Sequence, residues 1–209
     1  KIKIFKTNKL SDLVKDFFIN IKYDQLEKIK LDFKSNLFGG SDLCIQENFS
    51  RKKKIIACDM DKTVITIETI DLIAKRILKN SNISKLTEKA MRGNLNFKKS
   101  IEERTKILKG ISVDEIINII SSIKITNNAE KVIKTLNKNG CHTLLISGGY
   151  NLVADIIGKK IGFKEIISNK PVLNNGRLTG ELKGTLIDGK GKLNFLKKIM
   201  KINNANKYE

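Results

Sequence analysis

The fold is decided by the stretch Ile55-Ile56-Ala57-Cys58-Asp59-Met60-Asp61-Lys62-Thr63-Val64-Ile65. Its apolar beginning, preceded by three lysines and ended by charge, is typical of a buried strand in a parallel sheet. Asp59 and Asp61 follow directly where this strand ends. Because ligands of open α/β sheets bind at the carboxyl ends of the strands, the sequence predicts a functional site at these two carboxylates.

Two carboxylates separated by one residue can converge on one site if the backbone bends sharply after the strand. They would then repel each other unless a cation lay between them, and a hard divalent ion with oxygen ligands is suited to that place. One carboxylate of such a pair can act as a nucleophile while the other exchanges protons. The alternative is a strand that simply continues into a polar loop, although Thr63 and the return to apolar Val64 and Ile65 favour the site.

Length and composition favour a soluble cytoplasmic protein without a membrane partner. The 209 residues suit one domain with an insertion or two small domains. No apolar run reaches the roughly 18 residues that a membrane-spanning helix needs, and the first residues do not have the pattern of a signal peptide. Cys44, Cys58 and Cys141 form no Cys-x-x-Cys pair, so neither a disulfide framework nor a zinc site is indicated.

The net charge of +19 raises the possibility of nucleic-acid binding. Five of the 41 basic residues are Arg and the others are Lys, spread along the chain, and aromatic residues make up only 6%. A scattered excess of Lys without interleaved aromatics is more typical of a solvated surface, so we expect no nucleic-acid partner.

The chain is expected to begin with an extension over residues 1–50, in which apolar spacing over 10–33 predicts one or two amphipathic helices. After the Asp59 strand, helical patterns cover 68–79, 83–91, 97–108 and 113–123, with no convincing strand before residue 128. We therefore expect a helical cap over 73–127 that stands above the carboxyl end of the sheet and can exclude water.

Alternation of helix and strand resumes at residue 128, with helices over 128–139 and 151–161 and strands over 141–146 and 165–168. Asn175-Gly176 between two strand-like segments predicts a hairpin, and Asp188 is a candidate cap for a last helix over 192–201. Segments 51–72 and 128–209 thus form the core of an α/β fold with a Rossmann-like parallel sheet. Ser147-Gly148-Gly149 after a strand suits an anion site, although it can also be only a tight turn.

In this order the motifs resemble those of the haloacid dehalogenase-like phosphatases, over residues from about 53 to the end of the chain. The resemblance is greatest to the branch that hydrolyses phosphoserine in the last step of serine biosynthesis. The matching segments are Asp59-Met60-Asp61-Lys62-Thr63, Glu68-Thr69-Ile70-Asp71, Met91-x-Gly93-x-Leu95-Asn96-Phe97, Arg104, Ser147-Gly148-Gly149 and Lys192.

The resemblance implies a Mg²⁺-dependent enzyme in which Asp59 attacks the phosphorus and forms an aspartyl-phosphate. Asp61 would protonate the leaving oxygen and then take a proton from the hydrolytic water. The metal would be held by the Asp59 carboxylate and the Asp61 backbone carbonyl. Ser147, the Gly148 N–H and Lys192 would hold the phosphoryl oxygens, although Lys192 is one lysine among many.

The resemblance also implies a small-molecule substrate, O-phosphoserine, that is recognised by the cap. Glu68 would pair with its ammonium and Arg104 with its carboxylate. Arg104 can alternatively make only local ion pairs with neighbouring glutamates. Met91 and Phe97 would shield the site from water, or can equally be core residues.

Two departures from the family pattern are visible. The family's Gly-Asp motif, whose carboxylates complete the magnesium site, has no counterpart before Glu209, so we expect the intact gene product to continue and the 209-residue chain to bind metal weakly. Lys62 stands where the family commonly has a small residue. Alternative functions are a degenerate member that binds a phosphometabolite without turnover, and a phosphatase or phosphotransferase for another small monoester. The sequence does not indicate an oligomeric state.

Overall fold

The structure is a computed structural model that describes residues 3–34, 40–46, 48, 51–78 and 96–206. The chain divides into two compact units, Lys1–Asn48 and Phe49–Glu209. Each unit is described by itself below.

The first unit contains two strands and a helix rather than the helices expected over residues 10–33. Strands β1 (Ile4–Lys9) and β2 (Lys15–Ile19) pair antiparallel, and helix α1 (Tyr23–Lys34) follows them. The apolar residues at 13, 14, 17 and 18 fit a helical spacing, but Phe17 pairs across the hairpin with Thr7. The amides of Leu10 and Ser11 both donate to the Val14 carbonyl, which closes the turn between the strands. Only the last part of the predicted helical segment is therefore helical.

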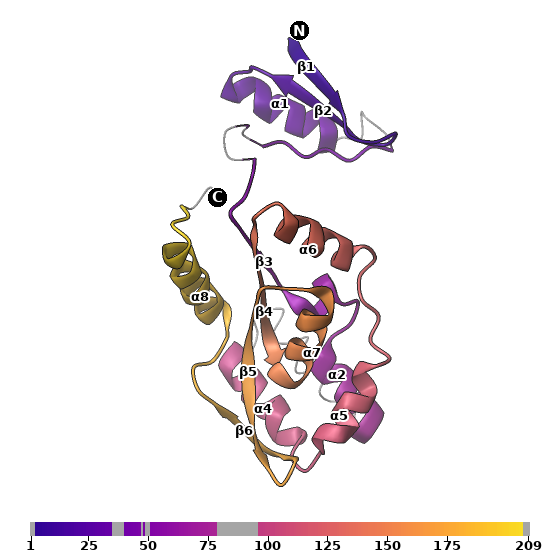
Figure 1. The fold of residues 1–209 in the computed structure, drawn as a ribbon, viewed down its shortest axis with the longest axis vertical. Helices are drawn as coiled ribbons and strands as arrows, with labels where there is room; N and C mark the ends of the chain where they lie inside the picture. Colours follow the sequence, from indigo (N-terminus) through magenta and orange to yellow (C-terminus); the bar gives the residue numbers. More distant parts are fainter. Residues whose placement is uncertain (1–2, 35–39, 47, 49–50, 79–95, 207–209) are drawn as a thin grey trace. The chain divides into compact units, whose positions relative to one another are not determined.

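The second unit is an α/β fold with the predicted order of elements (Figure 1). Its elements are β3 (Ile55–Cys58), the π-helical segment η1 (Met60–Val64), α2 (Thr69–Ile73), the π-helical segment η2 (Ala74–Leu78), α4 (Phe97–Ile107), α5 (Val113–Ile120), α6 (Ala129–Lys138), β4 (His142–Tyr150), α7 (Asn151–Ile161), β5 (Glu165–Asn174), β6 (Arg177–Lys183) and α8 (Gly189–Ile202). The helix expected over residues 83–91 lies outside the described residues.

The sheet has the order β3-β4-β5-β6. Strands β3, β4 and β5 are parallel, and β6 returns antiparallel to β5 through the predicted turn at Asn175-Gly176, both in left-handed backbone conformation. Strand β5 is longer than predicted because it continues through Pro171 into this hairpin. The parallel arrangement brings the carboxyl ends of β3, β4 and β5 to one edge of the sheet.

Apolar side chains of β4 alternate between two cores, one on each face of the sheet. Leu145 packs in the larger core, which includes Ile157 of α7, whereas Leu144 and Ile146 pack in the smaller core, which includes Ile199 of α8. Helices α7 and α8 therefore cover opposite faces, as Figure 1 shows for α7 (orange) and α8 (yellow). This arrangement fixes where the first turn of α8 meets the carboxyl ends of the strands.

Helices α4 and α5, which lie in the segment expected to form a cap, are hydrogen-bonded to the β5–β6 hairpin. The Gly110 amide, after α4, donates to the Leu178 carbonyl at 2.8 Å, and Ser112, before α5, forms a bridge with Arg177. Helix α5 begins with a capping box in which Ser112 and Glu115 exchange hydrogen bonds. The described part of the predicted cap is thus held against the sheet from the side of β6.

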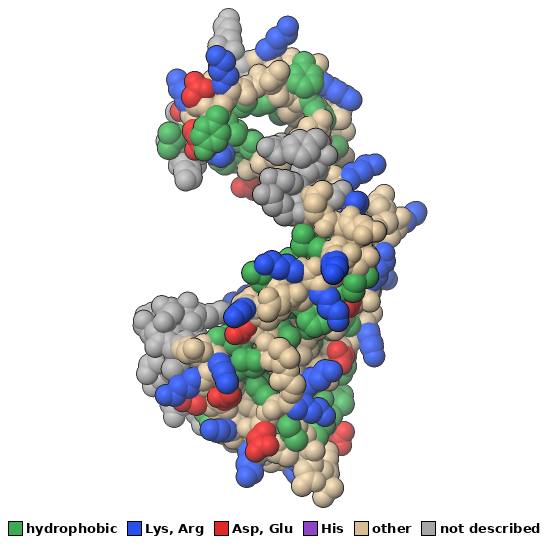
Figure 2. All heavy atoms as spheres, turned by 90° about the vertical axis from the view of Figure 1, so that its left-hand side faces the viewer, with side chains coloured by type: hydrophobic (Ala, Val, Ile, Leu, Met, Phe, Trp, Pro, Cys, Tyr) green, Lys and Arg blue, Asp and Glu red, His purple; other side chains and the backbone are tan. Residues whose placement is uncertain are grey.

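Charged side chains are scattered over the face of the molecule that Figure 2 draws. On the face shown in Figure 2, Lys and Arg side chains are distributed among Asp, Glu and apolar residues and do not gather in one block. Among the residues that the structure describes, no helix combines the length and the apolar character required to cross a bilayer.

Gly158 lets α7 approach the sheet closely. A Cβ at this position would lie 2.6 Å from Ile166 Cδ1 and 3.1 Å from Leu145 Cδ2. We predict that Gly158→Ala lowers the free energy of unfolding by about 1 to 3 kcal/mol, because an extra methyl must displace well-packed core side chains. Urea unfolding measures this change.

The matched control is Lys159→Ala, which introduces the same side chain at the next, exposed position of the helix. It should change the free energy of unfolding by less than about 0.5 kcal/mol. Equal stability of the two variants would mean that α7 does not pack against β5 as described.

Candidate active site

Asp59 is the first residue beyond β3, and its carboxylate caps the segment that follows. Its backbone is still extended, and its Oδ1 accepts a hydrogen bond of 2.8 Å from the Met60 amide. Met60 is fully buried, whereas the Asp59 side chain is 49% exposed. The core therefore anchors the chain one residue after the carboxylate and leaves the carboxylate accessible.

The sharp bend expected after Asp59 is present in η1. Asp61 is extended (φ −66°, ψ 133°) and Lys62 is left-handed (φ 53°, ψ 16°), so the chain reverses within two residues. The Ile65 amide donates to the Met60 carbonyl at 3.0 Å and closes the bend. This reversal places Asp61 under the start of α2.

The Asp61 side chain is largely buried and is hydrogen-bonded to Thr69. Its carboxyl group accepts hydrogen bonds of 3.3 Å from both the amide and the hydroxyl of Thr69. Burial and then the charge of Glu68 raise the pKa of Asp61 from 3.8 to about 7, against the two Thr69 bonds, and Asp59 adds to the rise. The two carboxylates thus differ strongly in their surroundings.

Lys192 pairs with Asp59 across the sheet edge. Its Nζ lies 2.8 Å from Asp59 Oδ2, and it belongs to the first turn of α8. The predicted last helix begins earlier than residue 192, because Asp188 accepts a hydrogen bond of 2.7 Å from the Gly191 amide and caps the helix there. Of the many lysines in the sequence, Lys192 is one that the fold brings to a predicted carboxylate.

Ser147-Gly148-Gly149 forms the last part of β4, where the pairing with β5 becomes irregular. The buried Ser147 hydroxyl oxygen accepts a bond of 2.9 Å from the Gly149 amide, so its own hydrogen remains available to another acceptor. A Cβ at Gly149 would lie 3.3 Å from Thr69 Oγ1 and 3.5 Å from Asp61 Oδ2. The end of β4 therefore lies directly beside Asp61.

Phe97 brings the start of α4 to the same place. As the first residue of α4, it is half-buried, and its ring atom Cζ would lie only 2.9 Å from a Cβ at Gly148. Helix α4 begins there because Asn96 accepts a hydrogen bond of 2.8 Å from the Lys98 amide. An apolar ring thus covers the end of β4.

Glu68 and Arg104 lie on separate elements of this region. Glu68 precedes α2, has a side chain 15% exposed, and pairs with Lys62 Nζ at 3.5 Å. Arg104 in α4 is only 6% exposed, and its Nε donates to the Ser100 carbonyl at 3.4 Å. Its charge also acts on the neighbouring Tyr150, whose pKa burial raises to about 12. Met91 lies outside the described residues.

Two residues of the site were not assigned a role from the sequence. Thr69 was quoted only as part of a motif, but it is the residue that holds Asp61. Asn169 of β5 donates 2.8 Å to the Gly148 carbonyl and accepts 2.8 Å from the Ile187 amide. A polar residue at the carboxyl end of a third parallel strand is the signal that would have indicated Asn169.

The oxygen ligands present suit a magnesium ion that shares its coordination with substrate and water. Among the residues described, no three His, Cys, Asp or Glu side chains are grouped to hold a metal. Mg²⁺, however, is commonly bound by one or two carboxylates together with phosphate oxygens and waters. The exposed Asp59 carboxylate fits this role, and Asp61, whose side chain is bound to Thr69, has its backbone carbonyl to offer.

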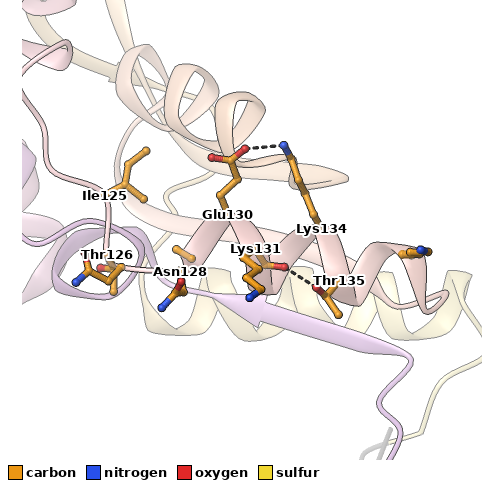
Figure 3. A pocket seen from close by; sticks show the side chains of 10 residues that line it. Ile125, Thr126, Asn128, Glu130, Lys131, Lys134 and Thr135 are labelled. Carbon is orange, nitrogen blue, oxygen red and sulfur yellow. Dashed lines mark hydrogen bonds and ion pairs between the residues drawn. The ribbon is translucent and has the colours of Figure 1, made fainter. Parts of the chain in front are cut away.

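A separate hollow of about 690 Å³ extends from the segment before α6 along the whole helix, from Ile125 to Lys138, and contains no predicted site residue. Figure 3 shows Glu130 and Lys134 paired with each other along its rim. All polar side chains that line this hollow are exposed or half-buried, so the hollow offers no buried polar group that would call for a ligand.

Comparison with known proteins identifies the same part of the chain. The family model of haloacid dehalogenase-like hydrolases matches residues 56–208. The phosphoserine phosphatase of Archaeoglobus fulgidus is 37% identical over 162 residues, 77% of this chain and 47% of the relative. That of Methanocaldococcus jannaschii is 34% identical over 75% of this chain and 74% of the relative. The chain therefore spans about half of the first relative and about three quarters of the second.

A solved structure is similar over the same region. It is described as a phospho-aspartyl intermediate analogue of phosphoserine phosphatase, with a TM-score of 0.69 and 34% identity over 75% of each chain.

We predict that Asp61 costs stability at neutral pH in protein kept metal-free with a chelator. The unfolded chain ionises Asp61 near pH 3.8 and the folded protein near 7, so stability is lost as the pH rises between these values. The Asn of the Asp61→Asn variant does not ionise. The free energy of unfolding of this variant minus that of the unmodified protein should therefore increase by on the order of 2 kcal/mol between pH 5 and pH 8. Urea unfolding at both pH values measures it.

Glu68→Gln is the companion variant, because it removes the charge that most raises the pKa of Asp61. When Glu68→Gln is present, the increase in the stability difference caused by Asp61→Asn between pH 5 and pH 8 should be smaller. An advantage of Asp61→Asn that is the same at both pH values would show that Asp61 has no raised pKa in the folded protein.

Proposed function

This chain belongs to the haloacid dehalogenase-like hydrolases, and we propose that it hydrolyses O-phosphoserine to serine and phosphate, the last step of serine biosynthesis, through an aspartyl-phosphate. The observation that carries the proposal is the unequal pair of carboxylates. Asp59 is exposed and paired with Lys192, whereas Asp61 is buried with a pKa of about 7. Carboxyl groups in such different environments are suited to different roles, one as nucleophile and one as acid.

In the first step Asp59 forms a bond to phosphorus while the bond from phosphorus to the serine oxygen breaks. Asp61, protonated in part at neutral pH, gives its proton to the leaving oxygen. In the second step water attacks the phosphorus, Asp61 takes a proton from it, and the Asp59 carboxylate is released. The Thr69 amide and hydroxyl keep Asp61 in place through both steps.

The phosphoryl oxygens are held by groups on two other elements. Lys192 offers a positive charge and the buried Ser147 offers its hydroxyl hydrogen, next to the Gly148 amide. We propose that Asp59 and the Asp61 carbonyl hold Mg²⁺. When bound, this ion neutralises charge on the nucleophile and the phosphate together.

The substrate's amino and carboxylate groups are assigned to Glu68 and Arg104. Glu68 precedes α2 close enough to Asp61 to influence its pKa, which places a negative charge near the reacting centre. Arg104 is a nearly buried cation on α4, the same helix whose first residue, Phe97, covers Gly148. We assign residues 73–127 to a cap, with Met91 and Phe97 as the apolar residues that shield the reaction from water.

We predict that Asp59→Asn lowers Mg²⁺-dependent phosphate release from O-phosphoserine by on the order of a thousandfold or more, because the amide cannot form the covalent intermediate. A colorimetric assay of inorganic phosphate measures the rate. Asp114→Asn, the same change at an exposed residue of α5, should leave the rate unchanged. If the unmodified protein releases no phosphate with Mg²⁺ present, the protein binds a phosphometabolite without turnover or has lost the activity.

We predict that Arg104→Ala costs about 2 kcal/mol in kcat/KM for O-phosphoserine and much less for phosphoethanolamine, which lacks the carboxylate. Lys106→Ala, which removes an exposed cation from the same helix, is the control for general charge loss. Equal losses on both substrates would remove Arg104 from substrate recognition and favour a structural role in the cap.

A further inference from the structure

Lys62 is a charged residue at a position of the active-site turn where its backbone is unfavourable. Its φ of 53° lies in the left-handed region, which Gly and Asn adopt most easily. The backbone conformation therefore does not explain why this residue is a Lys. Its side chain must be considered instead.

The Lys62 ammonium pairs with Glu68. The distance from Nζ to Oε1 is 3.5 Å, the Lys62 side chain is 57% exposed, and the Glu68 side chain is 15% exposed. The cation thus lies on the solvent side of a mostly buried carboxylate. The Lys62 amide also donates to the Ile67 carbonyl at 3.2 Å, which holds the turn next to the residue before Glu68.

We propose that Lys62 is a specificity-determining residue whose ammonium occupies the place beside Glu68 that the substrate's ammonium must take. The inference rests on the proposed function, because Glu68 is assigned there to the substrate's amino group. In the free protein Lys62 compensates the charge of Glu68. An amino-bearing monoester must displace it, whereas a monoester without an amino group leaves the pair intact.

The size of the effect follows from the geometry. An ion pair at 3.5 Å whose Lys side chain is 57% exposed is weak, and the flexible Lys can turn into solvent, so its displacement costs little. Removing the Lys62 charge should therefore strengthen binding of amino-bearing ligands about two- to fivefold relative to ligands without the amino group. Lys62 therefore reduces, but does not abolish, the preference of the site for phosphomonoesters that carry an amino group.

The test uses Lys62→Asn, because Asn tolerates the left-handed backbone. The probes are the phosphonate analogue of phosphoserine, in which CH₂ replaces the ester oxygen, and the same phosphonate without its amino group. Neither is hydrolysed, so titration calorimetry with Mg²⁺ present gives both Kd values without turnover. The ratio of the two Kd values cancels any general loss of attraction for anions.

The expected result is a two- to fivefold shift of this ratio toward the amino-bearing phosphonate, about what loss of a weak ion pair provides. Lys75→Asn, which removes an exposed lysine from η2, should not shift the ratio. In a Glu68→Gln background Lys62→Asn should not shift it either. A shift that persists without Glu68 would mean that Lys62 repels the ammonium directly, and would overturn the proposed displacement.

Three other results would also overturn the inference: an unchanged ratio, equal weakening of both phosphonates, and absence of binding by either. Equal weakening would show that Lys62 contacts the phosphonate or carboxylate. Hydrolysis of O-phosphoserine, measured in parallel, separates this inference from the proposed function. If O-phosphoserine is hydrolysed but the ratio of the two Kd values does not change, the proposed function is supported and the role of Lys62 is not. If the ratio shifts but no hydrolysis occurs, the role of Lys62 is supported and the proposed function is not.

Discussion

The site depends on one constraint, the reversal of the chain directly after β3. Met60 is buried in the core and Lys62 is left-handed, so the residues on either side of Met60 leave the strand toward different environments. Asp59 stays at the solvent side of the sheet edge, and Asp61 is turned beneath α2. A backbone that continued extended would place both carboxylates on the same face of the strand in similar solvation, and the contrast between an exposed and a buried carboxylate would be lost.

Distant segments meet at this reversal because parallel strands end at one edge. Thr69 comes from the start of the cap connection, Gly149 from the end of β4 and Lys192 from the first turn of α8. Each is positioned by its own element: Thr69 by the start of α2, Gly149 by the end of β4, and Lys192 by the capped start of α8. The site therefore needs no long ordered loop among these three groups, which keeps their relative positions well defined.

The sequence was informative where chemistry follows local pattern. The strand before Asp59, the strand before Ser147, helix α7 and the Asn175-Gly176 turn all follow from short-range signals and are present. Thr69 and Asn169 were missed because their roles depend on which groups lie opposite them in space. Lys192 was identified only by its place in the motif order. The N-terminal hairpin differs from the predicted helix because Leu13, Val14, Phe17 and Phe18 fit a helical spacing, whereas the pairing of β2 with β1, which this spacing does not reveal, decides the structure.

Asn169 joins the end of β4 to the start of α8 through one side chain. Its amide holds the Gly148 carbonyl on one side and the Ile187 amide, just before the cap of α8, on the other. The glycine segment at the end of β4 and the start of the lysine-bearing helix α8 are therefore hydrogen-bonded to the same side chain, although about forty residues separate them in the chain. Replacing the Asn169 side chain would therefore release both segments at once, and with them the spacing between the Ser147 hydroxyl and the Lys192 ammonium.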